Sequence, residues 1–453
     1  MAPSDLTNIF KAYDVRGTVP DQFNVDIARA VGVGFARFAK TSTILVARDM
    51  RPSGVELVAA FAEGAMSQGV NVVDLGLAST DLLYFAAGSL DAPGAMFTAS
   101  HNPAQYNGIK FCLSGARPVG VDTGLNQIRE VAVRELAQPS ASVAGRGQLS
   151  QRNLLDAFAD HVVSFVDQDQ LIPLKVVADT ANGMGGLVVP AVCERLPQIQ
   201  LEVMFGELDG TFPNHPADPI QPANQKDLQA RVLSGGFDVG LAFDGDADRV
   251  FVVDEKGIGL SGSTTTALLA AAVLRKNPGA KIIHNLICSK AVPEVITEYG
   301  GVPIRSQVGH SYIKQLMAET GAVFGGEHSA HYYFLNNYRA DSGLIAAMHV
   351  FNEMSRSGEP LSQVRIPFER YSASGEINTQ VNDPLAVIEK VGAAFSSFSS
   401  DRLDGLTVDC GSWWFNLRPS NTEPLLRLNL EAENRDECDQ RVSEVLSLIT
   451  QNA

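Results

Sequence analysis

The stretch TILVARDMRPSGVELVAAFAEGAMSQGVNVVDLGL, residues 43–77, indicates the fold class. Its first seven residues form an apolar run with β-branched side chains, which is typical of a buried strand. Pro52 fits a first helical turn. Apolar residues then recur at helical spacing at Val55, Val58, Ala59, Ala62 and Met66. Gly69 ends this helix before a second apolar run, residues 70–77, so the stretch predicts a βαβ unit with parallel strands.

The same pattern occurs twice more along the chain. Each further copy consists of a strand, a helix and a strand. They span 174–179, 187–195 and 201–205 in the second copy, and 281–287, a helix up to Tyr299, and 302–308 in the third. The letters of the copies differ, so the repeat is one of pattern. Three similar α/β domains are therefore expected.

Each copy ends in two strands joined by a loop rich in polar side chains. The three segments are GAMFTASHNPAQYNGIKFCL (94–113), VGLAFDGDADRVFVVDE (239–255) and AVFGGEHSAHYYFL (322–335). Ligands of α/β sheets bind beyond the strand ends. The three loops are therefore expected to face one central cleft.

The chain from about Phe368 has a different pattern and predicts a smaller α+β domain with its own loop, RPSNTEP (418–424). The predicted fold is three topologically similar α/β domains with mixed sheets around a central cleft, followed by this domain. The predicted boundaries are 1–148, 149–257, 258–366 and 367–453.

The composition excludes several classes of protein. The 453 residues carry a net charge of −16, with 45% hydrophobic and 19% charged residues, which is ordinary globular composition. Sequence-independent nucleic-acid binding needs a basic face, which this balance does not favour. No apolar run of membrane-spanning length and no secretory signal is present. The five scattered cysteines lack CxxC spacing, which favours reduced thiols and a cytoplasmic location.

The loop DGDADR predicts a cation site. Asp244, Asp246 and Asp248 place carboxylates at every second position, a hard oxygen cage for Mg²⁺ or Ca²⁺. A solvated acidic turn is the alternative. An EF-hand is excluded because Arg249 stands where that loop requires glycine and because a strand, not a helix, follows.

The other loops allow both functional and ordinary interpretations. Ser100 in TASHNP suits a nucleophile or phosphoryl carrier, with His101 and Asn102 as hydrogen-bonding neighbours, but it also fits a simple turn serine. Glu327 and Ser329 in GGEHSAH suit recognition of sugar hydroxyls, or a polar surface loop. Four side chains of RPSNTEP suit a phosphate dianion: Arg418, Ser420, Asn421 and Thr422.

The motifs AYDVRG, TASHNPAQYNGIK, DGDADR, GGEHSAH and RPSNTEP occur in this order along one chain. This combination resembles the α-D-phosphohexomutase superfamily, in its phosphomannomutase/phosphoglucomutase branch. The resemblance covers nearly the whole chain, from Tyr13 to the C-terminal domain, and it implies four domains of which the first three are alike.

The resemblance implies a role for each motif. Ser100 becomes the phosphoserine carrier and lies with Asp244, Asp246 and Asp248 at the Mg²⁺ site. Glu327 and Ser329 match the sugar loop. Arg418, Ser420, Asn421 and Thr422 match the distal phosphate site. The matching cleft positions are Tyr13, Arg16, His101, Lys110, Arg249, His310 and His331. Lys110, which follows the carrier loop, is favoured over His310 as general base.

The chain departs from the family pattern at three places. The metal loop has Ala247 where many members have glycine, but all three aspartates of the loop are present. The sugar loop has His328 and Ala330 in place of methionine and glycine. Ile287 stands where many relatives carry a substrate-contacting lysine, with Lys290 nearby. The distal pocket must then obtain that charge elsewhere.

The predicted function is a phosphomannomutase that also acts on glucose phosphates. It interconverts hexose 1- and 6-phosphates through phospho-Ser100 and a hexose 1,6-bisphosphate, which also serves as activator. Phosphoglucosamine mutase and a non-catalytic sugar-phosphate-binding protein are the alternatives. Hexose phosphates are the expected partners, and a monomer or weak homo-oligomer is the expected state.

Overall fold

Three α/β sheets of one topology follow one another along the chain. The computed structural model describes residues 6–141, 143, 145–419 and 425–451. Each sheet contains three adjacent parallel strands followed by an antiparallel strand. Further strands extend the first sheet on both sides of this shared arrangement. This confirms the repeat predicted from the pattern of strands and helices.

The first sheet has the order β1-β5-β4-β2-β3-β7, with β6 paired to β5. Its strands are β1 (Val15–Thr18), β2 (Thr43–Arg48), β3 (Asn71–Leu77), β4 (Gly94–Phe97), β5 (Tyr106–Leu113), β6 (Arg117–Pro118) and β7 (Leu149–Gln151). Its helices are α1 (Val25–Ala39), α2 (Gly54–Ser67), α3 (Thr80–Ser89) and α4 (Leu125–Ala137).

The second and third sheets have the orders β11-β10-β8-β9 and β13-β12-β14-β15. The second contains β8 (Leu174–Asp179), β9 (Ile199–Met204), β10 (Val239–Phe243) and β11 (Val250–Asp254), with α5 (Leu155–Val163), α6 (Gly185–Cys193) and α7 (Lys226–Gly235). The third contains β12 (Lys281–Asn285), β13 (Val302–Ser306), β14 (Phe324–Gly326) and β15 (Tyr332–Phe334). Its helices are α8 (Gly262–Lys276), α9 (Ala291–Glu298), α10 (His310–Thr320), α11 (Gly343–Ser357) and α12 (Leu361–Val364).

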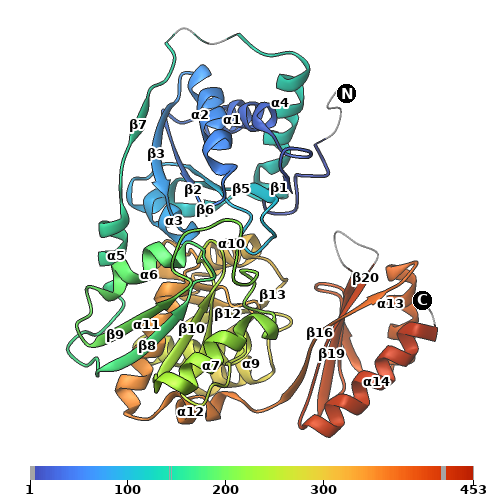
Figure 1. Ribbon diagram of the computed structural model, residues 1–453. Coiled ribbons are helices and arrows are strands. Elements are labelled where there is room, and N and C mark those ends of the chain that lie inside the picture. Colours follow the sequence, from blue (N-terminus) through green and yellow to red (C-terminus); the bar gives the residue numbers. More distant parts are fainter. Residues whose placement is uncertain (1–5, 142, 144, 420–424, 452–453) are drawn as a thin grey trace.

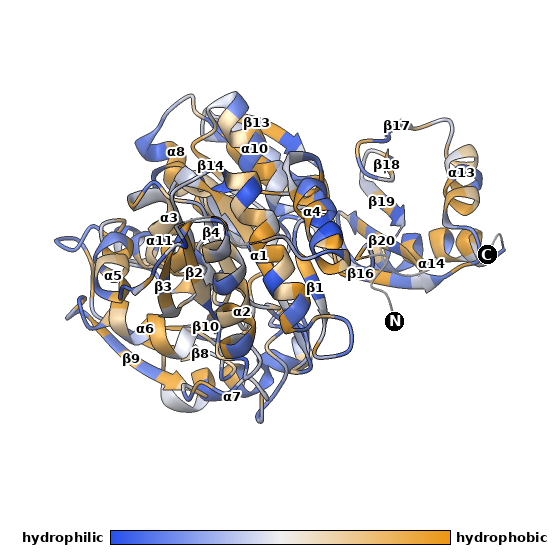
Figure 2. Cartoon of the chain, turned by 90° about the horizontal axis from the view of Figure 1, so that it is seen from above, coloured by the Kyte–Doolittle hydropathy of each residue, from blue (hydrophilic) through white to orange (hydrophobic). Residues whose placement is uncertain are grey.

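The fourth sheet is antiparallel throughout, in the order β16-β20-β19-β18-β17. It consists of β16 (Ser372–Gln380), β17 (Ser399–Asp401), β18 (Leu406–Asp409), β19 (Trp413–Pro419) and β20 (Leu425–Ala432), with α13 (Pro384–Ala394) and α14 (Arg435–Gln451). We call this part the C-terminal unit. It stands beside the rest of the molecule in both views (Figures 1 and 2). The predicted fold class is therefore confirmed.

The hydrophobic core explains this separation. One large cluster of buried side chains joins α3 to the second and third sheets, whereas α1, α2 and α4 cover the other face of the first sheet with a cluster of their own. The C-terminal unit has a separate core that includes Trp413 and Phe415. An element with its own core can move relative to its neighbours when few contacts hold it.

Some local predictions were wrong. Val55 and Ala59, predicted on the apolar face of their helix, are exposed, because the buried face of α2 is formed by other residues, among them Leu57, Phe61 and Ala65. The helix predicted from Leu187 begins at Gly185, and the strand predicted to reach Ile287 ends at Asn285. Among the described residues no helix is long and apolar enough to cross a membrane, and all five cysteines are free thiols.

Burial of His284 makes stability depend on pH. This side chain in β12 is 6% exposed, and its burial lowers its pKa from 6.5 to about 4. The unfolded chain therefore takes up a proton that the folded chain resists, so the protein is more stable above pH 6.5 than below pH 4, by about 3 kcal/mol from His284. This stability is lost as the pH falls from 6.5 towards 4. We expect the melting temperature of the unmodified protein to fall more steeply over that range than the melting temperature of His284→Gln.

His215 provides a control of opposite sign. Its hydrogen bond to Asp179, with Nε2 and Oδ2 3.0 Å apart, raises the pKa of His215 above 6.5. Its contribution is therefore present below pH 6.5 and is lost as the pH rises through the folded-state pKa. Melting curves of His215→Gln should converge with those of the unmodified protein at high pH. Equal pH slopes for His284→Gln and the unmodified protein would contradict this interpretation.

Candidate active site

Ser100 lies in the loop between β4 and β5 with a strained backbone. Its φ is 49°, in the left-handed region that non-glycine residues rarely adopt. The Ser100 backbone N–H donates to Thr98 Oγ1 at 2.8 Å, which fixes this turn. The Ser100 hydroxyl donates to Asp244 Oδ2 at 2.8 Å, and His101 Nδ1 lies 3.2 Å from the same hydroxyl. The serine loop and the acidic loop predicted from the sequence therefore meet.

Arg51 holds the backbone of this loop in place, and the sequence analysis missed this residue. Its side chain is fully buried. Its guanidinium donates to the backbone carbonyls of Ser100 at 2.8 Å and Asn102 at 2.6 Å, and it also reaches the carbonyls of Pro103 and Tyr106. Asp49 Oδ2 pairs with its Nε at 3.2 Å. The only sequence signal is an arginine that shortly follows a buried strand, which is too common to be recognised.

The acidic loop connects β10 and β11 and is buried. Asp244, Asp246 and Asp248 are each at most 1% exposed. Gly245 is required here, since a Cβ at this position would lie 2.4 Å from the carbonyl oxygen of Ser100. Ala247 adopts φ 59°, which explains why glycine is common at this position in the family that the motif resembles.

Two cations already face the three carboxylates. Lys110 Nζ lies 2.7 Å from Asp246 Oδ2 and 2.6 Å from Asp248 Oδ2, and Arg249 Nε lies 2.8 Å from Asp244 Oδ2. Burial raises the pKa of Asp244 to about 8 against the effect of Arg249. Burial would lower the pKa of Lys110, but Asp246 and Asp248 outweigh it and raise this pKa well above its usual value. Lys110 is thus placed to neutralise Asp246 and Asp248, and its role as general base stays a prediction.

The residues fit a divalent cation. Ligand atoms of the three aspartates lie within 4.8 Å of one another. Asp246 Oδ1 and Asp248 Oδ1 are buried and have no hydrogen-bond partner among the described residues. Buried carboxylate oxygens without partners are costly, and hard oxygen ligands are what Mg²⁺ prefers. Thr80, which the sequence analysis did not single out, orients Asp246 by donating from Oγ1 to Oδ2 at 2.6 Å.

The carboxylate of Glu327, between β14 and β15, is held by three donors. These are Tyr333 Oη at 2.6 Å, the backbone N–H of Gly309 at 3.1 Å and Asn285 Nδ2 at 3.2 Å. Ser329 Oγ lies 3.0 Å from His331 Nδ1 in the same loop. Glu327 is 1% exposed, whereas Ser329 and His331 are partly exposed. Ser329 and His331 are therefore more open to a ligand than Glu327, whose contact with a sugar stays a prediction.

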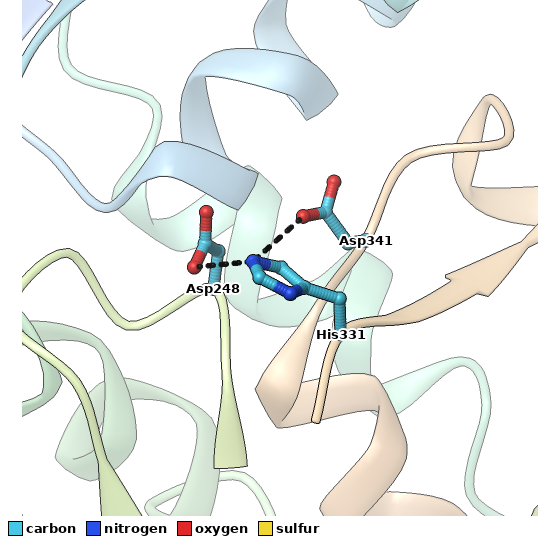
Figure 3. A group of neighbouring side chains, drawn as sticks. All are labelled: Asp248, His331 and Asp341. Atoms are coloured by element: carbon cyan, nitrogen blue, oxygen red, sulfur yellow. Dashed lines mark ion pairs between the residues drawn. The ribbon is translucent and has the colours of Figure 1, made fainter. Parts of the chain in front are cut away.

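His331 joins this loop to the acidic loop. Its Nε2 points toward Asp248 and Asp341, at 3.8 Å from Asp248 Oδ1 and 4.0 Å from Asp341 Oδ2 (Figure 3). Asp341 is also paired with the buried Lys314 at 2.7 Å. The second and third loops thus form one continuous polar surface.

The N-terminal motif and α10 bring further predicted residues to the same region. Arg16 pairs with Asp14 and donates from Nη1 to Asn102 Oδ1 at 2.6 Å. Tyr13 donates from its hydroxyl to the carbonyl of Val308 at 3.0 Å, and its ring lies edge-on to His310 with centroids 5.2 Å apart. Burial lowers the pKa of His310 well below its usual range, so this imidazole is neutral.

The phosphate loop is only partly described. Arg418, at the end of β19, donates from Nη2 to Glu376 Oε2 at 3.0 Å. Ser420, Asn421 and Thr422 lie outside the described residues. Ile287 is buried, and Lys290 Nζ is occupied by Asp409 Oδ1 and the carbonyl of Gly411, each at 2.8 Å. Lys290 therefore does not take the place of the substrate-contacting lysine that many relatives carry at the position of Ile287.

The four sheets follow in the order that the resemblance implies, and the serine loop meets the aspartate loop. Models of the phosphoglucomutase/phosphomannomutase family match the chain domain by domain. Alpha/beta/alpha domains I, II and III match residues 7–138, 156–257 and 261–371, and the C-terminal domain matches residues 376–448. The chain belongs to the phosphoglucomutase/phosphomannomutase family. The junctions predicted near residues 148, 257 and 366 stay predictions.

Individual relatives support this assignment. The chain is 40% identical over 450 residues to a phosphomannomutase of Salmonella montevideo, covering 97% of this chain and 98% of the relative. It is 40% identical over 431 residues to a phosphomannomutase of Escherichia coli K12, covering 93% and 94%. A crystal structure of a phosphoglucomutase/phosphomannomutase family protein from Burkholderia thailandensis superposes with a TM-score of 0.88 at 30% identity, covering 98% and 97%.

Proposed function

We propose that this protein is a phosphomannomutase that also acts on glucose phosphates, interconverting hexose 1- and 6-phosphates. The observation that carries the proposal is the contact of Ser100 with Asp244, because it brings the phosphoryl carrier to the cation site. The 40% identity to named phosphomannomutases supports the substrate class. By this proposal the protein is an isomerase and a phosphoprotein of carbohydrate metabolism. It is expected in the cytoplasm as a monomer or weak homo-oligomer.

The proposed reaction consists of two phosphoryl transfers, one from Ser100 to the sugar and one from the sugar back to Ser100. In the first, the P–O bond to Ser100 breaks while the free hydroxyl of a hexose monophosphate gains the phosphoryl group, and the proton of that hydroxyl passes to the Ser100 oxygen. The product is a hexose 1,6-bisphosphate, which turns around in the cleft. In the second transfer its other phosphate returns to the Ser100 oxygen, and the proton of the serine hydroxyl passes to the sugar oxygen that the phosphate leaves. Traces of the bisphosphate activate the enzyme by loading Ser100.

Charge control is the main task of the surrounding residues. Phosphoserine carries nearly two negative charges and lies beside three carboxylates. Asp244, Asp246 and Asp248, with the phosphoserine, would hold Mg²⁺, which stabilises charge on the transferring phosphoryl group when bound. Arg249, whose Nη2 lies 3.5 Å from Ser100 Oγ, is placed to contact the phosphoryl oxygens. Lys110 neutralises Asp246 and Asp248, and Lys110 or His310 would take the proton of the attacking hydroxyl.

The other predicted residues bind the sugar phosphate. We assign Glu327, Ser329 and His331 to the sugar hydroxyls, and Arg418, Ser420, Asn421 and Thr422 to the distal phosphate. Tyr13, Arg16 and His101 line the path between them. The separate core of the C-terminal unit supports a hinge that opens while the bisphosphate turns and closes to exclude water.

Phosphoglucosamine mutase is the close alternative, since it shares the fold and the carrier. Turnover of mannose 1-phosphate, glucose 1-phosphate and glucosamine 1-phosphate should be compared at equal enzyme and bisphosphate concentrations. Mannose and glucose phosphates are expected to react with higher kcat/KM than glucosamine phosphate. The reverse order would replace the proposed substrate class. Binding without any turnover would favour a sugar-phosphate-binding protein.

Removal of divalent cations should suppress turnover. Without a cation, the buried carboxylates oppose the charge that develops during transfer, so a loss of at least about a hundredfold is expected. Turnover is measured after dialysis against a chelator and again after Mg²⁺ is restored. The same dialysis should lower the melting temperature of the unmodified protein but not that of Asp246→Asn. Full turnover in the chelated protein would exclude the cation site.

A further inference from the structure

Two arginines face each other on neighbouring strands of the C-terminal unit. In the register of β19 and β20, Arg418 lies opposite Arg427. Directly opposed like charges destabilise a sheet unless an anion lies between them. The side chains are 13% and 33% exposed, so water screens this repulsion only in part.

Glu376 supplies the anion. Its Oε2 lies 3.0 Å from Arg418 Nη2, and its Oε1 lies 3.3 Å from Arg427 Nη1. A β-bulge between Ala373 and Glu376, with Gly375 at φ 68°, interrupts the pairing of β16 with β20. Bulges change the direction in which a side chain points. One carboxylate therefore spans both guanidinium groups.

This cluster lies close to the sugar loop. One cavity is lined both by His328 of that loop and by Gly375, the neighbour of Glu376. The charges of Glu376 and Arg418 also act on the pKa of His328, which burial lowers, Glu376 raises and Arg418 lowers further. They are therefore placed where the distal phosphate of a bound sugar is expected.

The two arginines have donors that remain free for a larger anion. Arg418 Nε and Arg427 Nε are buried and have no hydrogen-bond partner among the residues that the structure describes. Guanidinium groups bind carboxylate and phosphate with the same fork of donors. A phosphate dianion offers more oxygens and more charge than Glu376, so it can take over these donors.

We propose that Glu376 is an internal competitor of the distal phosphate: its carboxylate occupies Arg418 and Arg427 in the free enzyme and yields them when a phosphate binds. That this phosphate belongs to a hexose phosphate rests on the proposed function. The bisphosphate must leave the distal site to turn around, so a competing carboxylate weakens binding and speeds this release. Glu376 is thus a positioning residue that lowers affinity and raises turnover.

The test compares Glu376→Gln with the unmodified full-length protein. Glutamine keeps the size and one acceptor of glutamate but removes its charge. Calorimetric titration with inorganic phosphate should show binding about three- to tenfold tighter, the effect of removing two partly exposed charge pairs. Glu389→Gln is the matched control, because Glu389 forms an exposed pair with Arg402 in the same unit. Its phosphate affinity should equal that of the unmodified protein.

A double variant and kinetics complete the test. If Glu376 and the phosphate compete for Arg427, Glu376→Gln should improve phosphate binding much less in an Arg427→Met background. With hexose phosphate, Glu376→Gln should lower both KM and kcat, a change that a merely structural ion pair would not produce. Equal or weaker phosphate binding by Glu376→Gln would overturn the proposal. Absence of turnover in the unmodified protein would instead refute the proposed function, while the phosphate titration still decides the role of Glu376.

Discussion

Ser100→Ala should lose mutase turnover by about a thousandfold or more, because no other group can carry the phosphoryl between substrate and product. Among the residues that the structure describes, the hydroxyl of Ser100 contacts Asp244, His101 and, at 3.5 Å, Arg249. Its removal leaves the backbone of the loop fixed by Thr98 and Arg51. Affinity for hexose phosphate should therefore change little.

The measurement combines kcat in the presence of saturating glucose 1,6-bisphosphate with calorimetric affinity for the monophosphate. Ser114→Ala is the control. Ser114 follows β5 of the same sheet, and its hydroxyl donates to the backbone carbonyl of Asp91, away from the site. That control should keep full activity. Turnover of Ser100→Ala within tenfold of the unmodified protein would rule out Ser100 as the carrier.

Arg51→Met should strongly destabilise the protein as well as inactivate it. The substitution leaves Asp49 as a buried carboxylate without its partner and leaves four loop carbonyls without their donor. Breaking a buried ion pair costs about 3–5 kcal/mol, and unpaired buried acceptors add to it. We expect a large fall in melting temperature or a failure to accumulate folded protein.

Arg51→Lys keeps the prediction testable if the methionine variant does not fold. Lysine retains the charge for Asp49 but cannot reach four carbonyls in a fork. This variant should fold and yet lose much of its kcat, because the turn at Ser100 loosens. Arg29→Met is the control: Arg29 pairs with Glu63 at an exposed site and should cost less than about 1 kcal/mol. An Arg51→Met protein as stable as Arg29→Met would contradict the supporting role of Arg51.

The sequence predicted the architecture because its signals were local. Apolar runs and helical spacing marked the three βαβ copies, and polar residues between paired strands marked the loops that meet at Ser100 and Asp244. The motif resemblance added Tyr13 and Arg16, which no local pattern would have distinguished from surface turns.

Other features depend on tertiary packing and had no local signal. Arg51 and Thr80 become important only because the loops that they support fold over them. Lys110 lies on a strand with no local sign of a partner, yet it is buried between two aspartates. Glu376 bridges Arg418 and Arg427 across three strands, a contact that depends on sheet order and on a bulge.

Phosphorus NMR of mannose 1-phosphate, incubated with the full chain, Mg²⁺ and a trace of glucose 1,6-bisphosphate, decides whether phosphoryl transfer through Ser100 occurs. The proposed function predicts that the mannose 1-phosphate signal is replaced by that of mannose 6-phosphate, and that Ser100→Ala leaves it unchanged. An unchanged spectrum from unmodified protein whose Ser100 is shown to be phosphorylated would contradict the assignment as a phosphomannomutase.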